Sequence, residues 1–143
     1  MTAGRRDPPT VAGAAPTPVA GEAQGPVLCL TEPISFWGGV NPASGRIVET
    51  RHPQAGSSVT GTVLVMPYSR GSTSSPSVVA EMIRVGTAPA GVILGRADHF
   101  IVLGALVAEE LYRLTMPVVI LEDPRMARAS RAWIQADGRV RFQ

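Results

Sequence analysis

Apolar residues along the chain fall into short runs separated by polar turns. Four of these runs are rich in Val, Ile and Leu and have the length of buried strands. They lie at residues 27–30, 62–66, 92–94 and 117–121. A further extended piece is expected at residues 34–37, before Gly38-Gly39 interrupts the pattern. These runs predict a sheet at the centre of the molecule.

The segment after residues 62–66 predicts a helix with clear start and stop signals. Apolar side chains recur there at helical spacing, at Val78, Val79, Met82 and Ile83. Ser75 is the expected N-cap, and Pro76 stands at the first helical position. Gly86 is the expected stop.

A second helix is expected from about residue 99 to residue 114. Its predicted apolar face consists of Leu103, Leu106, Val107, Leu111 and Leu114. The end of the chain, residues 133–142, predicts a hairpin that turns at Asp137-Gly138. The middle of the chain therefore reads strand, helix, strand, helix, strand, with extra β pieces on either side. This order predicts one α/β domain.

Residues 1–25 show no apolar periodicity and predict a flexible tail rich in Pro, Ala and Gly. Such a segment has little apolar surface to offset the entropy cost of ordering it. A linker with a function of its own is the alternative. We expect the folded domain to span residues 26–143, since the 143 residues of the chain fit one domain rather than two.

The composition is that of a globular protein. Hydrophobic residues make up 45% of the chain and charged residues 17%, with a formal net charge of +2. These values exclude a disordered chain and a polybasic nucleic-acid binder. The longest apolar stretch, residues 100–108, is too short to cross a membrane. Arg5 and Arg6 precede Asp-Pro-Pro instead of the apolar segment of a signal peptide, so the expected location is the cytoplasm.

Most other side chains that could carry chemistry favour structural roles. The single cysteine, Cys29, excludes a disulfide framework or a Cys-rich metal site within the chain, and its apolar surroundings favour an inert thiol. His52 and His99 lack metal-ligand spacing, so each is expected as a loop or capping residue. Glu109 and Glu110 are expected on the solvent side of their helix.

The aromatic residues leave one question open. Phe36 and Trp37 stand beside the paired glycines, where they either line a ligand or partner subunit or serve ordinary packing. Trp133 and Phe142 are expected to cover the core through the terminal hairpin.

The loop before Pro76 is the best candidate for a functional site. A polar, Gly-containing loop between a strand and a helix N-terminus is how α/β proteins build anion sites, because the first-turn N–H groups lack intrahelical partners. Arg70 adds a permanent cation, and Gly71 permits close backbone approach. Hydroxyl groups follow at Ser72, Thr73, Ser74 and Ser75. The alternative is a loop that only caps its helix.

Several motifs in the same order resemble the small subunit of the aconitase X family. They are residues 34–40 (ISFWGGV), 45–48 (GRIV), 52–56 (HPQAG), 70–74 (RGSTS), 86–90 (GTAPA) and 108–112 (AEELY). The resemblance covers residues 27–121, and the Pro-rich segment before Pro26 lies outside it. Tyr68 and Pro76 depart from the family pattern, but residues 70–72 do not.

The resemblance implies a swivelling β/β/α domain like the swivel domain of aconitases. It also implies a larger, Cys-containing partner subunit that supplies the ligands of an iron or iron–sulfur centre. Ser72 then corresponds to the family's proton acceptor, which removes the proton α to a carboxylate while the iron helps the β-hydroxyl leave. A serine can act so only where donors hold its alkoxide. Arg70, Gly71, Thr73 and Ser74 are the expected substrate-binding residues.

The expected function is therefore that of a hydro-lyase small subunit, active only with its large subunit in a heterodimer. The expected substrate is cis-3-hydroxy-L-proline, which loses water to give Δ1-pyrroline-2-carboxylate. One alternative within this class is a mevalonate 5-phosphate dehydratase small subunit. The other alternative is a non-catalytic α/β module that holds an anion at the Arg70 loop.

Overall fold

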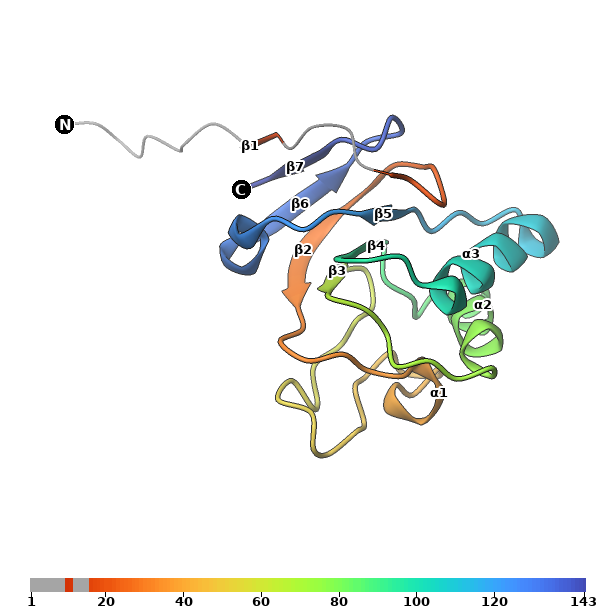
Figure 1. Cartoon of the computed structure of the whole chain (residues 1–143). Coiled ribbons are helices and arrows are strands. Elements are labelled where there is room, and N and C mark those ends of the chain that lie inside the picture. The colour runs from red at the N-terminus through yellow and green to blue at the C-terminus, as the bar shows by residue number, and fades with distance from the viewer. Residues whose placement is uncertain (1–9, 12–15) are drawn as a thin grey trace.

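The computed structural model describes residues 10–11 and 16–143. Its centre is a seven-stranded sheet with the order β1-β7-β6-β2-β3-β4-β5 (Figure 1). The strands are β1 (Thr10–Val11), β2 (Ala23–Cys29), β3 (Val63–Met66), β4 (Gly91–Leu94), β5 (Val118–Ile120), β6 (Arg131–Ile134) and β7 (Val140–Phe142). The helices are α1 (Phe36–Gly39), α2 (Ser75–Val85), α3 (His99–Tyr112) and the 3₁₀ helix η1 (Pro124–Arg128).

Strands β2, β3, β4 and β5 run parallel, which confirms the predicted strand–helix–strand order. Both faces of this half are covered, so its strands read as nearly continuous apolar runs. Side chains on one face pack toward α2 and α3; they are Leu64, Met66, Val92, Leu94 and Val118. Side chains on the other face meet η1 and the terminal hairpin; they are Val63, Ile93 and Val119. The sheet therefore lies between two cores.

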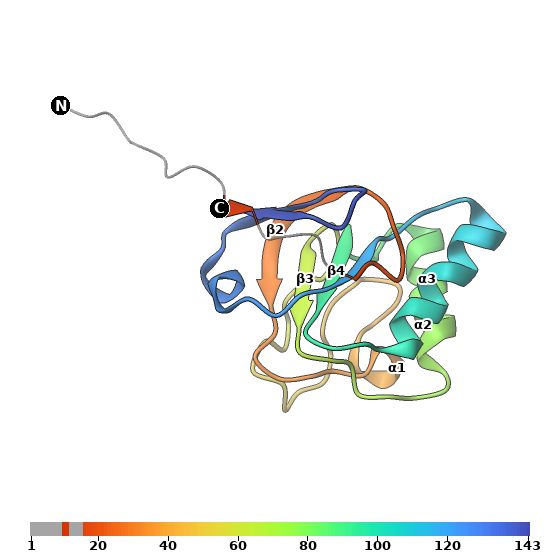
Figure 2. The same ribbon diagram turned by 45° about the horizontal axis from the view of Figure 1, so that its top comes forward.

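The second half of the sheet is antiparallel and begins at the same strand, β2. One side of β2 pairs with β3, and the other side pairs with β6 of the terminal hairpin. The hairpin turns at Asp137-Gly138 as predicted, and Gly138 has the positive φ of 88° that such a turn requires. Figure 2 shows this half lying across the ends of the parallel strands. Side chains of both halves meet in one core, which includes Val63 of β3 and Ile134 of β6.

The two long helices pack side by side on the same face of the sheet (Figures 1 and 2). They pack tightly at Gly104, where an added Cβ atom would lie 2.7 Å from the Cβ of Val79 and 2.8 Å from the carbonyl oxygen of Pro76. The buried face of α3 consists of Ile101, Gly104, Ala105 and Ala108.

The apolar face predicted for α3 is therefore wrong. Four of its five members are exposed, namely Leu103, Leu106, Leu111 and Leu114. The spacing of the leucines matched a helical stripe, but the neighbouring stripe of small residues allows a closer approach of the two backbones. The helix carries apolar residues on both sides, and the side with the small residues Gly104, Ala105 and Ala108 packs against the rest of the domain.

Folded structure begins earlier than the expected boundary at Pro26, which falls inside β2. Val19 is buried and exchanges two backbone hydrogen bonds with Val118, so it covers the outer edge of β5. Thr10–Val11 pair with β7. Residues 16–25 thus belong to the fold, whereas the rest of the expected tail, apart from residues 10 and 11, lies outside the described residues.

Two local expectations also need correction. Residues 36–39 form the short helical turn α1 instead of an extended piece, and Phe36 is buried in the core while Trp37 is exposed. Phe142 covers the core as expected. Trp133, however, is only half-buried and faces a surface pocket.

Replacing Gly104 with alanine tests the contact between α2 and α3. Alanine favours helix by about 1 kcal/mol over glycine, but its methyl group clashes with Val79 and with backbone, which costs about 1–3 kcal/mol. We expect Gly104→Ala to lower the free energy of unfolding in urea. Leu103→Ala, on the exposed side of the same helix, should change it by less than about 0.5 kcal/mol. Equal stability of Gly104→Ala and the wild type would contradict the described packing.

Candidate functional site

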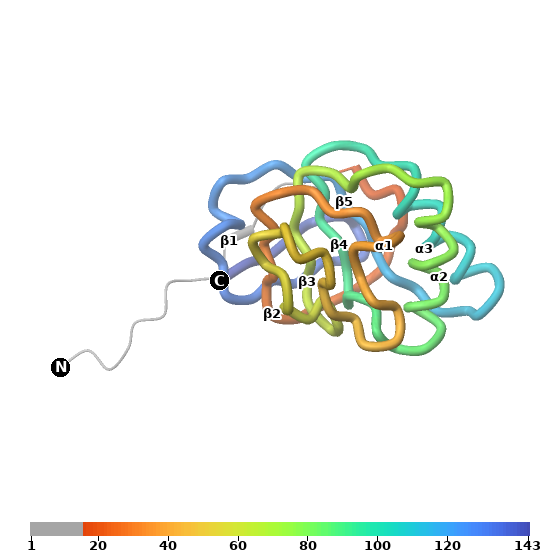
Figure 3. The backbone as a smooth tube through the Cα atoms, turned by 90° about the horizontal axis from the view of Figure 1, so that it is seen from below, coloured from red at the N-terminus to blue at the C-terminus, as the bar shows by residue number. Residues whose placement is uncertain are grey.

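The loop of residues 67–74 connects the carboxyl end of β3 to the first turn of α2. This edge of a parallel sheet is where α/β proteins commonly bind ligands. Figure 3 looks onto the edge and shows the loop beside α1 and the start of α3. All five site residues expected from the sequence lie on this one loop; they are Arg70, Gly71, Ser72, Thr73 and Ser74.

Ser72 lies immediately before α2 and is half-buried. Its hydroxyl oxygen accepts a hydrogen bond from the backbone N–H of Ser74 at 3.3 Å. Its carbonyl oxygen accepts another from the N–H of Ser75 at 3.0 Å. One backbone donor therefore already points at the hydroxyl oxygen, in a position where it would stabilise negative charge. Thr73 is exposed, and Ser74 is half-buried.

The start of α2 differs from the expected cap. Ser74, not Ser75, occupies the N-cap position, and its side chain makes no capping bond. Ser75 is instead fully buried, with its hydroxyl oxygen 3.4 Å from that of Ser35 and 3.4 Å from the N–H of Trp37. Ser75 thus ties α1 to α2 and leaves Ser72 and Thr73 at the surface. The stop at Gly86 is as predicted.

Arg70 is held above the loop by a carboxylate from another part of the chain. Its Nη1 atom lies 3.0 Å from Oε1 of Glu49, and its backbone N–H donates to the carbonyl oxygen of Ile34 at 3.1 Å. The Arg70 side chain is 54% exposed. A single exposed ion pair orients the guanidinium but contributes at most about 1 kcal/mol, so an incoming anion can compete with Glu49.

Asp98 fixes the start of the loop to the start of α3. One carboxylate oxygen accepts hydrogen bonds from the backbone N–H and the hydroxyl of Ser69. The other oxygen caps α3 by accepting from the N–H groups of Phe100 (2.9 Å) and Ile101 (3.3 Å). Asp98 and Ser69 are both buried, so these bonds are shielded from water. Ser69 is therefore a structural hydroxyl, and Ser72 is the accessible one.

Two ring contacts complete the frame of the loop. A Cβ atom on Gly71 would lie 2.5 Å from the ring of Phe100, so a larger residue there would require this ring to move. On the other side, the guanidinium of Arg96 stacks 3.8 Å from the ring centroid of Tyr68. Arg96 thus places a second positive charge beside the loop.

His52 has the structural role that the sequence suggested. It is buried, and its Nε2 atom lies 2.9 Å from the carbonyl oxygen of Glu32. Its Nδ1 atom accepts a hydrogen bond from the N–H of Gln54 at 3.0 Å. The ring therefore joins two surface loops. His99 is exposed as the first residue of α3, which Asp98 caps in its place.

Cys29 lines a pocket of about 290 Å³ at the same edge of the sheet, between the ends of β2, β3 and β5. The thiol is half-buried, and burial raises its pKa above the usual value, which disfavours the reactive thiolate. Among residues 10–11 and 16–143, no group of three His, Cys, Asp or Glu side chains could hold a metal ion. The described part of the chain also has no helix that could span a bilayer.

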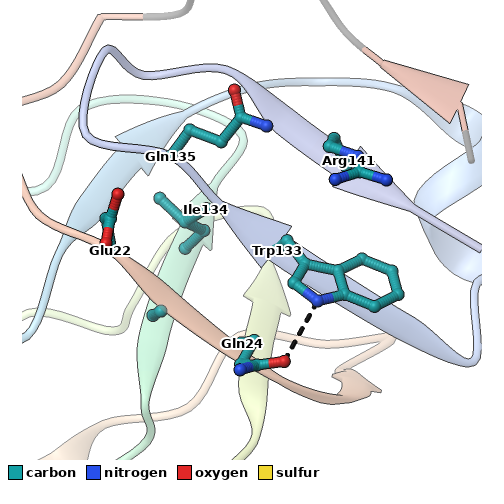
Figure 4. Close-up of a pocket in the computed structure, with 7 residues that line it drawn as sticks. Glu22, Gln24, Trp133, Ile134, Gln135 and Arg141 are labelled. Atoms are coloured by element: carbon teal, nitrogen blue, oxygen red, sulfur yellow. Dashed lines mark hydrogen bonds between the residues drawn. The ribbon is translucent and has the colours of Figure 1, made fainter.

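A second pocket, of about 320 Å³, lies on the antiparallel half of the sheet (Figure 4). The indole N–H of Trp133 donates to Oε1 of Gln24 at 3.0 Å, and Glu22 and Arg141 flank the pocket. No residue of the loop 67–74 lines it. The two features are thus separate parts of the surface.

Sequence reasoning missed three residues that shape the site: Glu49, Asp98 and Phe100. An Asp directly before a helical pattern is a capping signal, so the cap at Asp98 could have been found. Its bond to Ser69, 29 positions away in the chain, and the pairing of Glu49 with Arg70 depend on the three-dimensional fold.

Comparisons with known proteins agree on one family. The family described as the aconitase X swivel domain matches residues 14–141. A cis-3-hydroxy-L-proline dehydratase of Pseudomonas aeruginosa is 40% identical over 125 residues, which is 87% of this chain but 22% of that protein. A phosphomevalonate dehydratase small subunit of Methanothermobacter thermautotrophicus is 44% identical over 88 residues, 62% of this chain and 67% of that protein.

A solved structure extends the match to the fold. The crystal structure of Thermococcus kodakaraensis aconitase X in its holo-form superposes with a TM-score of 0.76 and 26% identity, over 91% of this chain and 96% of that chain. The expected swivel-domain fold is thus confirmed. The chain spans about a fifth of the length of the Pseudomonas protein that it matches.

Asp98→Asn tests the anchor between the loop and α3. An amide keeps one acceptor oxygen but turns an NH₂ group toward either Ser69 or the helix N–H groups, and each unsatisfied buried group costs about 1–3 kcal/mol. We expect lower stability in urea, together with faster amide hydrogen exchange at residues 69–75 and in the first turn of α3. Asp123→Asn, which alters the cap of η1, is the matched control and should leave exchange in the loop unchanged. Unchanged loop exchange in Asp98→Asn would refute the anchor.

Proposed function

The chain belongs to the aconitase X swivel domain family, and we propose that it is the small subunit of a hydro-lyase that dehydrates cis-3-hydroxy-L-proline. The observation that carries this proposal is the Arg70-Gly71-Ser72 segment at the carboxyl edge of the parallel sheet, where Arg70 and Gly71 are exposed and Ser72 is half-buried. The longer match supports this substrate, because the similarity to the hydroxyproline enzyme extends over 125 residues and that to the phosphomevalonate subunit over 88.

Ser72 is the proposed proton acceptor. As an alkoxide, its oxygen takes the proton from C2 of the substrate, and the electron pair of that bond forms a double bond between C2 and C3 as the 3-hydroxyl leaves as hydroxide. The proton taken up by Ser72 passes to this hydroxide, which gives water and restores the alkoxide. The resulting cyclic enamine tautomerises to Δ1-pyrroline-2-carboxylate when its nitrogen loses a proton and C3 gains one. The Ser74 N–H bond to the Ser72 oxygen supports this role, since it favours the charged form of the hydroxyl.

Arg70 is the proposed ligand of the substrate carboxylate. A guanidinium can bind a carboxylate through two parallel hydrogen bonds, and the exposed Arg70 can exchange its half-buried partner Glu49 for a substrate carboxylate. Because Gly71 has no side chain, its backbone can approach the substrate closely. The hydroxyl groups of Thr73 and Ser74 are further proposed substrate contacts. Placing the carboxylate at Arg70 brings the adjacent C2 atom toward Ser72.

The iron or iron–sulfur cluster implied by the family finds no ligand set among the described residues, where no group of three His, Cys, Asp or Glu side chains could hold a metal ion. We therefore propose that its ligands belong to a larger, Cys-containing subunit. This chain then supplies the proton acceptor and the carboxylate ligand, and the complex forms in the cytoplasm as a heterodimer.

Two other functions remain testable. A mevalonate 5-phosphate dehydratase small subunit would use the same loop on a phosphorylated hydroxy acid, and the archaeal relatives support it. A non-catalytic module would hold an anion at Arg70 without turnover. Assaying one preparation of the two subunits with both substrates separates the three cases.

Ser72→Ala should abolish most of the activity of the reconstituted enzyme. Loss of the proton acceptor is expected to lower kcat by about 10²–10⁴-fold, while KM changes little because the carboxylate contacts remain. Release of Δ1-pyrroline-2-carboxylate measures the rate. Ser44→Ala, an exposed serine outside the loop, serves as the control and should retain full activity. A near-normal rate for Ser72→Ala would show that another group takes the proton.

Arg70→Lys should act mainly on substrate binding. Lysine keeps the charge but loses the paired hydrogen bonds, so we expect KM to rise by about 10-fold or more with a smaller change in kcat. Arg46→Lys, at an exposed arginine in another loop, should leave both constants unchanged. An unaltered KM in Arg70→Lys would remove Arg70 from the substrate site.

A further inference from the structure

Three leucines of α3 and one that follows the helix are exposed. They are Leu103, Leu106, Leu111 and Leu114, which we call the leucine face, with exposed fractions of 52%, 44%, 64% and 43%. We propose that the leucine face is a docking surface for the large subunit, so that one interface covers both the Ser72 loop and α3. This inference rests on the proposed function, and it assigns the partner to a particular surface of this chain.

Single leucines on a protein surface are ordinary, but this helix is apolar on both sides. Its inner side is filled by Ile101, Gly104, Ala105 and Ala108. A helix that is apolar all round normally lies between two layers of protein. The described structure supplies only the inner layer, formed by α2 and the sheet. We infer that a partner supplies the outer layer.

The leucine face adjoins the candidate site. Phe100, in the first turn of α3, packs against Gly71, and Asp98 binds Ser69. Leu106 stands six positions after Phe100, about 9 Å along the helix axis. An ordinary interface buries about 800 Å² on each partner, an area about 30 Å across. A partner that covers the Ser72 loop therefore reaches the leucine face without unusual size.

The other border of the loop is also apolar. Trp37, next to the loop through the bond of its N–H to Ser75, is 60% exposed. The Ser72 loop thus has the exposed Trp37 on one side and the leucine face on the other. Exposed charged residues of both signs, Glu109, Glu110 and Arg113, lie beside Leu111 and Leu114 at the end of α3. An apolar centre with a charged rim is the usual composition of a protein interface.

The large subunit fits this surface better than a second copy of the chain. A second copy of the chain bound beside the Ser72 loop would compete for this surface with the large subunit, which the proposed reaction requires. The Pseudomonas relative, of which the matching segment is 22%, shows that a domain of this family can occur within a much longer protein. A long polypeptide is a partner that can cover both the loop and α3.

Leu106→Glu tests the proposal with Val85→Glu as its matched control. Both side chains are 44% exposed, but Val85 ends α2 beside Pro42 and Ala43. We expect Leu106→Glu to weaken binding to the purified large subunit at least 10-fold by titration calorimetry, and Leu103→Glu to do the same. Val85→Glu should change the affinity less than twofold. At saturating large subunit, kcat should recover, because Leu106 does not touch the substrate.

Folding is checked for every variant by circular dichroism and urea unfolding, and Leu106→Ala replaces Leu106→Glu if the latter unfolds. Normal affinity in both the Leu103 and the Leu106 variants would overturn the proposal. A dimer of the chain alone that Leu106→Glu dissociates, with binding to the large subunit unchanged, would assign the face to a second copy. A wild-type complex without dehydratase activity would refute the proposed function, whereas the affinities would still decide the docking surface.

Discussion

The buried carboxylate of Asp98 is the contact on which the site depends. It joins two elements that the sheet alone leaves independent, because one oxygen binds the loop at Ser69 and the other caps α3. A charge buried this far is stable only when its hydrogen bonds are satisfied. The loop is consequently fixed at its first residues, and its next residues, Arg70 to Ser72, project from a defined base.

The rest of the fold holds this base in place. The parallel strands are buried on both faces, and α2 and α3 approach closely at Gly104, so the two helix starts keep their spacing. The same architecture leaves Arg70 exposed, with its guanidinium paired to the single, half-buried carboxylate of Glu49. A serine in water is a poor base, so the fold supplies position and charge but needs a partner to exclude water. The apolar outer side of α3 is consistent with that need.

Sequence reasoning recovered the elements whose signals are local. The apolar runs located the four parallel strands, Pro76 and Gly86 marked α2, and Asp137-Gly138 marked the hairpin. Sequence reasoning failed to identify which side of helix α3 is buried. On α3 the leucines formed the more obvious hydrophobic pattern. The buried face nevertheless contains Gly104, Ala105 and Ala108, because small residues let α2 and α3 pack closely. Contacts between distant segments, such as Ser69 with Asp98, carry no local signature. The start of the domain was also misplaced, since Val19 covers an edge that becomes visible only in the folded sheet.

The central claim is that the Ser72 oxygen removes the C2 proton of the substrate. The most direct measurement uses cis-3-hydroxy-L-proline carrying tritium at C2 and follows the release of tritium to water in the complex of both subunits. The account predicts rapid release by the wild-type complex and almost none by a complex with Ser72→Ala that still binds the substrate. Release at the wild-type rate from the Ser72→Ala complex would contradict it.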